Sequence, residues 1–256
     1  MTTVQNVLDF IETIAPTELK MEWDNVGLLC GRADQQVQKI LVALDPFTSV
    51  CEEAAQIGAD LLVTHHPLIF QPLSAITDKT TVGRAAMTLI KNNIAAINAH
   101  TNLDCADGGV NDTLAQTLKL KAIQKVPTDS EGLLRQGEVE TQDLDAFLHR
   151  VEKTLDCNGL RYVSGGKPVN RVAVGGGACG SALYTVIAAG CDTFVTADVK
   201  YNQFCDAKEL GLNLIDAGHF PTENPVMAVL AAKLQTQFPD LEVKISETHR
   251  DSVKYY

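Results

Sequence analysis

Short apolar runs alternate along this chain with longer segments of helical periodicity. The runs KILVALD (39–45), DLLVTHH (60–66) and IAAINAH (94–100) are rich in apolar residues, which predicts buried strands. Apolar residues recur at helical spacing in residues 48–57, 80–93, 110–118, 142–155 and 200–210. Alternating strands and helices of this kind predict an α/β protein.

The second half of the sequence repeats the pattern of the first. RVAVGG (171–176), DTFVTAD (192–198) and LNLIDAGH (212–219) are further strand candidates, and LEVKIS (241–246) is the last. Lys39 and Asp60 are 21 positions apart, as are Arg171 and Asp192. This spacing predicts an internal duplication. Because residues 119–135 are polar and weakly patterned, we expect halves at 1–125 and 126–256 that form one compact unit around a cleft.

Composition narrows the class of protein. The chain is 45% hydrophobic, yet no run approaches the roughly 20 apolar residues that span a bilayer. The N-terminal residues follow helical spacing and do not resemble a signal peptide. The seven cysteines are odd in number and form no CxxC pair, which indicates reduced thiols. We therefore expect a cytoplasmic protein with no membrane association.

The formal net charge of −11 argues against an extended nucleic-acid surface. Binding of a polynucleotide draws its affinity from basic side chains that neutralise phosphates, and no run of lysine and arginine is present. A single nucleotide held by metal ions stays compatible with an acidic chain. A small-molecule ligand is the partner that the charge favours.

Histidines and carboxylates gather at the ends of the predicted strands. His65 and His66 end one strand, His100 ends another, and Asp104 follows it. In open α/β sheets ligands bind beyond the carboxyl ends of the strands. Neighbouring residues of a strand point to opposite faces, so His65 and His66 share a site only if the backbone turns there. Pro67 marks such a turn.

The second half adds a histidine and a carboxylate four residues apart, in GHFPTE (218–223). The predicted metal ligands are His65, His66, Asp104, His219 and Glu223. Five ligands are too many for one tetrahedral ion with an open position, so they predict two ions. Imidazole with carboxylate favours Zn, Fe, Mn or Ni. Asp104 and Glu223 could instead stabilise helix N-termini, and a helix is expected to begin near Pro221.

Other residues have weaker signals. His100 is the best candidate for a catalytic proton shuttle, because it ends a strand beside the expected metal site. Trp23 could stack on a base or be a core or interface aromatic. VAVGGGACG (172–180) could cradle a phosphate or be a tight strand-to-helix turn. His149 is expected to be solvated, and His249 has no assigned role.

Five ordered motifs resemble the NIF-three-like family, whose members are often named GTP cyclohydrolase 1 type 2 homologs. They are EWDNVGLLCG (22–31), VTHHP (63–67), AHTNLD (99–104), TADVKYNQ (196–203) and DAGHFPTE (216–223). The resemblance implies a duplicated α/β fold, the same five metal ligands and a toroidal homohexamer. Some members carry an inserted domain, for which the segment between the halves is too short here. The family often has a histidine where Asn202 stands, so no ligand is expected from that position.

Three functions are compatible with these features. The first is a dinuclear-metal hydrolase of a nucleotide or related heterocycle, in which the ions activate water. The second is a hydrolase of a small phosphoester, because two ions can also clamp a phosphoryl group. The third is a non-catalytic metal-binding adaptor or metal-handling ring. The sequence does not choose the metal or the substrate.

Overall fold

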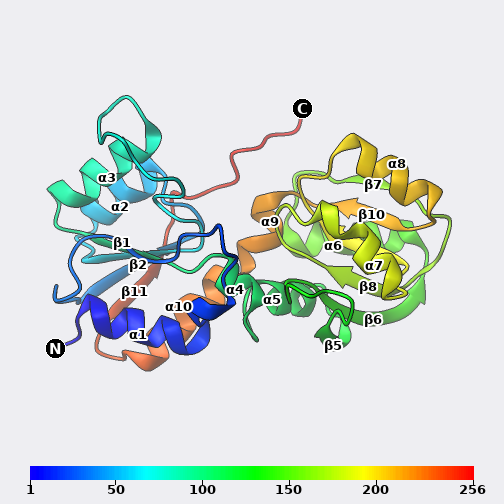
Figure 1. Ribbon diagram of the computed structural model, residues 1–256, viewed down its shortest axis with the longest axis horizontal. Helices are drawn as coiled ribbons and strands as arrows, with labels where there is room; N and C mark the ends of the chain where they lie inside the picture. Colours follow the sequence, from blue (N-terminus) through cyan, green and yellow to red (C-terminus); the bar gives the residue numbers. More distant parts are fainter. The chain divides into compact units, whose positions relative to one another are not determined.

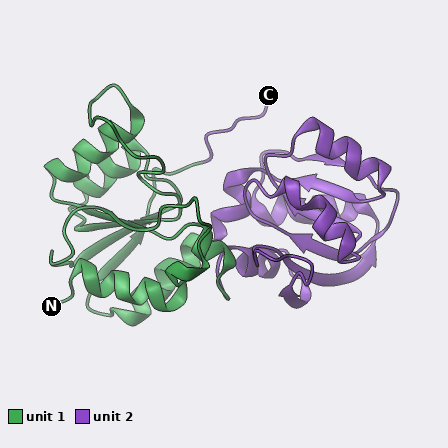
Figure 2. Ribbon diagram, in the orientation of Figure 1, with its two compact units in different colours: residues 1–107, 227–250 green, residues 108–226, 251–256 purple.

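The computed structural model covers residues 1–256 and confirms the α/β prediction (Figure 1). The chain folds into two compact units, one of residues 1–107 and 227–250 and one of residues 108–226 and 251–256 (Figure 2). None of the helices combines the length and the apolar character needed to cross a lipid bilayer. All seven cysteines are free thiols, and Cys51, Cys105 and Cys191 are buried.

The first unit is built on a five-stranded sheet of order β1-β4-β3-β2-β11. Its strands are β1 (Gly27–Cys30), β2 (Lys39–Ala43), β3 (Leu61–Thr64), β4 (Ala95–Asn98) and β11 (Glu242–Ile245). Its helices are α1 (Val4–Ile14), η1 (Thr17–Leu19), α2 (Thr48–Gln56), α3 (Thr81–Lys91), α4 (Thr101–Cys105) and most of α10 (Pro225–Gln237). β2, β3, β4 and β11 are parallel, and β1 closes one edge antiparallel to β4.

The second unit is built on a six-stranded sheet of order β5-β6-β8-β9-β10-β7. Its strands are β5 (Lys121–Lys125), β6 (Arg135–Gln142), β7 (Arg161–Val163), β8 (Val169–Val174), β9 (Thr193–Thr196) and β10 (Asn213–Asp216). Its helices are α5 (Val110–Thr117), α6 (Leu144–Leu155), η2 (Gly180–Ala182), α7 (Leu183–Ala188), α8 (Tyr201–Glu209) and α9 (His219–Glu223). β8, β9 and β10 are parallel, and β7 lies antiparallel to β10.

The two sheets share a frame of four strands. In each, three consecutive parallel strands follow an antiparallel edge strand that precedes them in the chain: β1 with β2-β3-β4, and β7 with β8-β9-β10. An aspartate begins the second parallel segment in both. The Asp60 carboxylate accepts hydrogen bonds from the backbone N–H groups of Gln38 and Lys39, and Asp192 accepts them from Asn170 and Arg171. The equal spacing in the sequence therefore reflects the same hydrogen-bonded arrangement in both units.

The units differ from the sequence-based division at residue 125 for two reasons. α5 packs against β6 and β8 and so belongs to the second unit, although it precedes residue 125. β11 pairs in parallel with β2, which returns the end of the chain to the first unit. The division at 1–125 and 126–256 follows the repeat along the sequence, whereas packing follows these long-range contacts.

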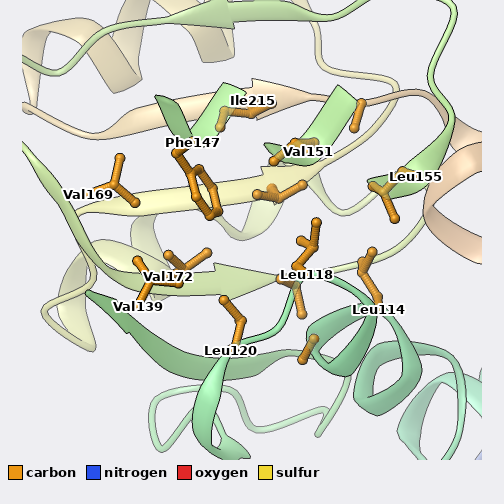
Figure 3. Close-up of a cluster of buried hydrophobic side chains, with 14 of the residues drawn as sticks. Leu114, Leu118, Leu120, Val139, Phe147, Val151, Leu155, Val169, Val172 and Ile215 are labelled. Atoms are coloured by element: carbon orange, nitrogen blue, oxygen red, sulfur yellow. The ribbon is translucent and has the colours of Figure 1, made fainter. Parts of the chain in front are cut away.

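Each unit has its own hydrophobic core. In the second, α6 lays Phe147 and Val151 on Val172 of β8 and Ile215 of β10 (Figure 3). In the first, Leu41 and Leu62 of the sheet pack with Val50 of α2 and Leu89 of α3. Burial of these apolar side chains fixes the strands in register, and so places the polar residues at the strand ends.

Candidate metal centre

The His65–His66 pair lies where β3 ends. The strand stops at Thr64, whose hydroxyl donates to the His66 carbonyl at 2.8 Å. The His66 N–H bonds instead to the carbonyl of Leu44 at 2.9 Å. The backbone thus departs from the extended strand, and the two imidazole centroids lie 4.9 Å apart. The turn that the sequence requires beside Pro67 is present.

Asp104 lies in α4, which the sequence analysis did not distinguish from a loop. The helix is a single turn that begins directly after His100. It carries Asp104 to a buried position, where one carboxylate oxygen, Oδ1, is 3.6 Å from His65 Nε2. Two ligands of a tetrahedral ion with bonds of about 2.0 Å lie roughly 3.3 Å apart, so this pair fits a shared ion.

His100 joins the same cluster. The ring nitrogens of His65, His66 and His100 that could bind a metal lie within 4.8 Å of one another. The His100 centroid is 5.1 Å from that of His65 and 5.4 Å from that of His66. Three imidazoles from two neighbouring strand ends therefore converge within the first unit.

Each of these imidazoles is held through its Nδ1 atom. His65 Nδ1 is 2.9 Å from the carbonyl oxygen of Ala99, which can only accept, so Nδ1 carries the proton. His66 Nδ1 is 2.7 Å from Asp45, and His100 Nδ1 is 2.8 Å from Asp24. A proton fixed on Nδ1 leaves Nε2 with a lone pair, which is the form in which histidine binds a metal or accepts a proton.

Two aspartates, the buried Asp24 and the half-buried Asp45, orient His100 and His66, and the sequence analysis missed both. Burial by itself would raise the pKa of Asp45, but hydrogen bonds from His249 and His66 outweigh it and hold that pKa well below its usual range. Burial would also raise the pKa of Asp24, but hydrogen bonds from His100 and Thr101 outweigh this effect. The pKa of Asp24 is therefore well below its usual range. Both groups are therefore carboxylates that accept from the rings.

His249 has a structural place that the sequence did not assign. It is buried, and its Nε2 is 2.9 Å from the second oxygen of Asp45. Asp45 thus bridges His66 and His249, and ties the segment after β11 to the candidate site. His149, in contrast, is exposed on α6, as expected.

The second unit places His219 and Glu223 on one helix. α9 begins at His219, two residues earlier than the expected start near Pro221. Gly218 permits this, because its φ of 86° allows a sharp entry, and Pro221 is tolerated within a first turn. Residues i and i+4 of a helix share a face, and His219 Nε2 is 3.0 Å from Glu223 Oε2.

Asp198 orients His219. Its carboxylate is 2.7 Å from His219 Nδ1, so the arrangement repeats that of Asp45 with His66. The Asp198 side chain is 56% exposed, whereas that of Asp45 is 20% exposed. Asn202 lies exposed on α8.

The glycine-rich turn after β8 accommodates the Glu223 carboxylate. The N–H groups of Gly175, Gly176 and Gly177 donate to Val195 O, Asn111 Oδ1 and Thr222 Oγ1. A Cβ on Gly177 would lie 2.2 Å from Glu223 Oε1. A phosphate cradle needs free N–H groups, so the turn is a tight connection that makes room for a carboxylate.

The donor set fits divalent transition metals. The candidate ligands are imidazole Nε2 atoms and one buried carboxylate in each unit, Asp104 in the first and Glu223 in the second. Zn, Fe, Mn and Ni prefer such ligands. The clusters can therefore hold metal.

Comparison with known proteins identifies the family of this chain. The chain matches the family model Duf34/NIF3 (NGG1p interacting factor 3) over residues 2–252. It is 34% identical to a GTP cyclohydrolase 1 type 2 homolog from Clostridium perfringens, over 98% of this chain and 99% of that protein. It is 37% identical to a protein of the same name from Streptomyces coelicolor, over 98% and 93%. The chain belongs to the Duf34/NIF3 family.

Solved structures agree with the family assignment. A Bacillus cereus protein related to NIF3 superposes with a TM-score of 0.94 at 25% identity, covering 100% of this chain and 99% of that one. Reduced HcgD from Methanocaldococcus jannaschii superposes with a TM-score of 0.83 at 31% identity, covering 96% and 98%. The resemblance drawn from the five motifs is confirmed.

Proposed function

We propose that this protein binds two divalent metal ions through His65, His66, Asp104, His219 and Glu223, and that it is a hydrolase of a nucleotide or a related heterocycle. One observation carries the proposal: every histidine of the set has its Nδ1 engaged by an oxygen acceptor, which leaves Nε2 for an ion. Histidines that serve only in packing have no need of this common orientation.

The five ligands are assigned to one dinuclear centre. The first unit supplies two imidazoles and a carboxylate, and the second supplies one of each. Five ligands exceed what one tetrahedral ion with an open position takes, so they suit two ions with positions left for water and substrate. The names of the homologous GTP cyclohydrolase 1 type 2 homologs support a heterocycle as the substrate class.

Two bound ions would lower the pKa of a water molecule and polarise the bond to be cleaved. His100 is the residue to transfer protons in this reaction. Asp24 fixes the proton on His100 Nδ1, so His100 Nε2 can take a proton from water and pass it to a leaving group. Asp24 acts through His100 and is a positioning residue. Thr101 holds Asp24 in place through its N–H and its hydroxyl.

The test is hydrolysis by the metal-loaded protein. Purified protein is supplied with Zn, Mn, Fe or Ni, and release of products from GTP, guanosine and small phosphoesters is followed by chromatography. Glu223→Gln keeps the size of the side chain and removes its charge, so it should lower bound metal and turnover together. Turnover that persists after metal loss contradicts the proposal, and so does a fully metal-loaded protein that cleaves nothing in the panel.

A homohexamer belongs to the same proposal, and the family resemblance supports it. Light scattering should give a particle of six times the 27.6 kDa chain mass. A monomer at micromolar concentration contradicts this part without affecting the metal assignment.

A further inference from the structure

The chain's single tryptophan is held at the surface beside His100. Trp23 lies in the turn between η1 and β1, and it is 61% exposed. Phe70, on the segment after His66, is 43% exposed, and its ring centroid is 5.8 Å from that of Trp23 at an interplanar angle of 66°. Two large aromatic rings thus contact each other while much of their surface stays exposed to solvent.

The backbone that carries these rings is firmly anchored. Asp24, next to Trp23, is buried and bound to His100 and Thr101. Asn25 donates from Nδ2 to the carbonyl of Ile69 at 2.6 Å, which ties the tryptophan turn to the residue before Phe70. Asn98 of β4 donates in turn to the carbonyl of Asn25. The exposure of the rings is therefore built into the fold and does not come from a loose loop.

Both rings adjoin the imidazole cluster. The His100 centroid is 6.3 Å from that of Trp23 and 6.2 Å from that of Phe70, with steep interplanar angles in both cases. His100 itself contacts His65 and His66. An aromatic surface made of Trp23 and Phe70 therefore continues directly from the candidate metal ligands of the first unit.

The charges around this surface favour a flat, uncharged group. Lys20, three residues before Trp23, donates from its Nζ to the carbonyl oxygens of Met21 and Asp24. Its ammonium group is thereby engaged by backbone oxygens. Every nucleobase has a π-face that can stack on an aromatic ring. A planar heterocycle is the ligand chemistry that this surface matches.

We propose that Trp23 and Phe70 bind the heterocyclic ring of the substrate and stack on it, so that the ring lies beside His100. The inference rests on the proposed function for the identity of the ligand, and it names the residues that select it. Stacking on one aromatic ring contributes roughly 1–3 kcal/mol, so loss of Trp23 should weaken binding roughly 5- to 150-fold.

The single tryptophan provides the probe. Its fluorescence is followed in the metal-loaded protein while guanosine, GTP or ribose 5-phosphate is added. Guanosine and GTP should quench it with saturation, and ribose 5-phosphate, which has no ring to stack, should not. Quenching by ribose 5-phosphate alone, or none by any compound, overturns the inference.

Variants separate stacking from other roles of Trp23. Calorimetry with guanosine should show a loss of binding for Trp23→Leu and a smaller one for Phe70→Leu, with Trp23→Phe within a few-fold of the wild type. Tyr201→Leu is the matched control, because Tyr201 is 84% exposed in the other unit and should be without effect. Wild-type affinity in Trp23→Leu overturns the inference, including the case in which that variant changes only the oligomeric state.

Failure of this inference is distinguishable from failure of the proposed function. Trp23→Leu should retain the wild-type metal content, because Trp23 donates no ligand. If wild-type protein binds metal and hydrolyses its substrate while Trp23→Leu does so with unchanged KM, only the stacking site is wrong. If wild-type protein binds no metal, the proposed function fails, and saturable quenching by guanosine would still support the stacking site.

Discussion

The two units present their site residues at equivalent points of the same strand frame. β3 ends at Thr64, paired with Asn98 of β4, and β9 ends at Thr196, paired with Asp216 of β10. Two residues beyond these ends the first unit has His66 and His100, and the second has Asp198 and Gly218. The same strand frame thus carries two imidazoles in the first unit, and a carboxylate and a glycine in the second.

Burial differs as well. The side chain of His65 is fully buried, whereas that of His219 is 37% exposed. The first unit fixes its rings with the Ala99 carbonyl and with the Asp45 and Asp24 carboxylates, and the second relies on the exposed Asp198. The comparison teaches that the frame decides where ligands can lie, while the local side chains decide how rigidly they are held. The first unit should therefore hold its candidate ligands more rigidly than the second.

The largest effect is expected from Gly177→Ala in the second unit. The new Cβ would meet the Glu223 carboxylate at 2.2 Å, and the φ of 63° is unfavourable for alanine. The free energy of unfolding should fall by roughly 2–5 kcal/mol, from strain and overpacking together. Gly58→Ala is the control, because Gly58 has a φ of 67° and open space around it. Equal losses in chemical denaturation would show that Glu223 does not occupy this turn.

The next effect concerns a clamp that only the first unit has. Glu53 of α2 accepts hydrogen bonds from Ser246 Oγ at 2.5 Å, Glu247 N at 2.8 Å and Thr248 Oγ1 at 2.6 Å. The corresponding helix α7 of the second unit, LYTVIA, has no acidic residue. Glu53→Gln should cost about 2 kcal/mol of unfolding free energy at neutral pH, since charged acceptors bind more strongly.

The pH dependence of this clamp has a definite sign. Burial raises the pKa of Glu53, but the hydrogen bonds from Ser246 and Thr248 outweigh it and lower the pKa. Its contribution is therefore present above the unfolded pKa of about 4.3 and is lost as pH falls through the folded pKa. Urea unfolding should show a gap between wild type and Glu53→Gln at pH 7 that narrows toward pH 3. A gap independent of pH would rule out this role.

A third prediction sharpens the contrast in preorganisation. Asp45→Asn should lower metal affinity about 10- to 100-fold, because it weakens the hydrogen bond that orients His66. Asp198→Asn should lower it less, since Asp198 is exposed to water. Competition with a chromogenic chelator measures both, with the exposed Asp34→Asn as the control. A larger loss in Asp198→Asn would reverse the order of the two units.

The smallest effects should be equal in the two units. Asp60→Asn and Asp192→Asn each replace a carboxylate that accepts hydrogen bonds from two consecutive backbone N–H groups. Each should cost about 1 kcal/mol in the free energy of unfolding, because the amide oxygen of asparagine still accepts but makes weaker hydrogen bonds than a carboxylate. Calorimetric melting compares them directly. A clear difference between the two losses would mean that the two strand frames differ in local structure although their strand order is the same.

The central parallel strands were predictable because they are apolar and short. The edge strands β1, β5 and β7, and β6 beside β5, were not identified, since these strands mix polar and apolar residues and depend on their neighbours. β11 was predicted as a strand, but its pairing with β2 is a contact between distant parts of the chain. A pattern along the sequence cannot show which distant strand a segment joins.

The site divides in the same way. The candidate ligands follow strand ends and could be named in advance, whereas Asp24 and Asp45 could not be linked to His100 and His66. Asp24 is 76 residues from His100, and a lone aspartate in a loop carries no signal of its partner. His249 was missed because its segment is polar, although Asp45 and the turn after β11 bury it.

Metal content per chain tests the central claim most directly. It is measured by elemental mass spectrometry on wild-type protein purified without added metal, and on a variant that combines His66→Ala with Glu223→Ala and so removes one ligand from each unit. The account predicts nearly two ions per wild-type chain and few in the variant. Negligible metal in both proteins, even after reconstitution with Zn, Mn, Fe or Ni, would contradict it.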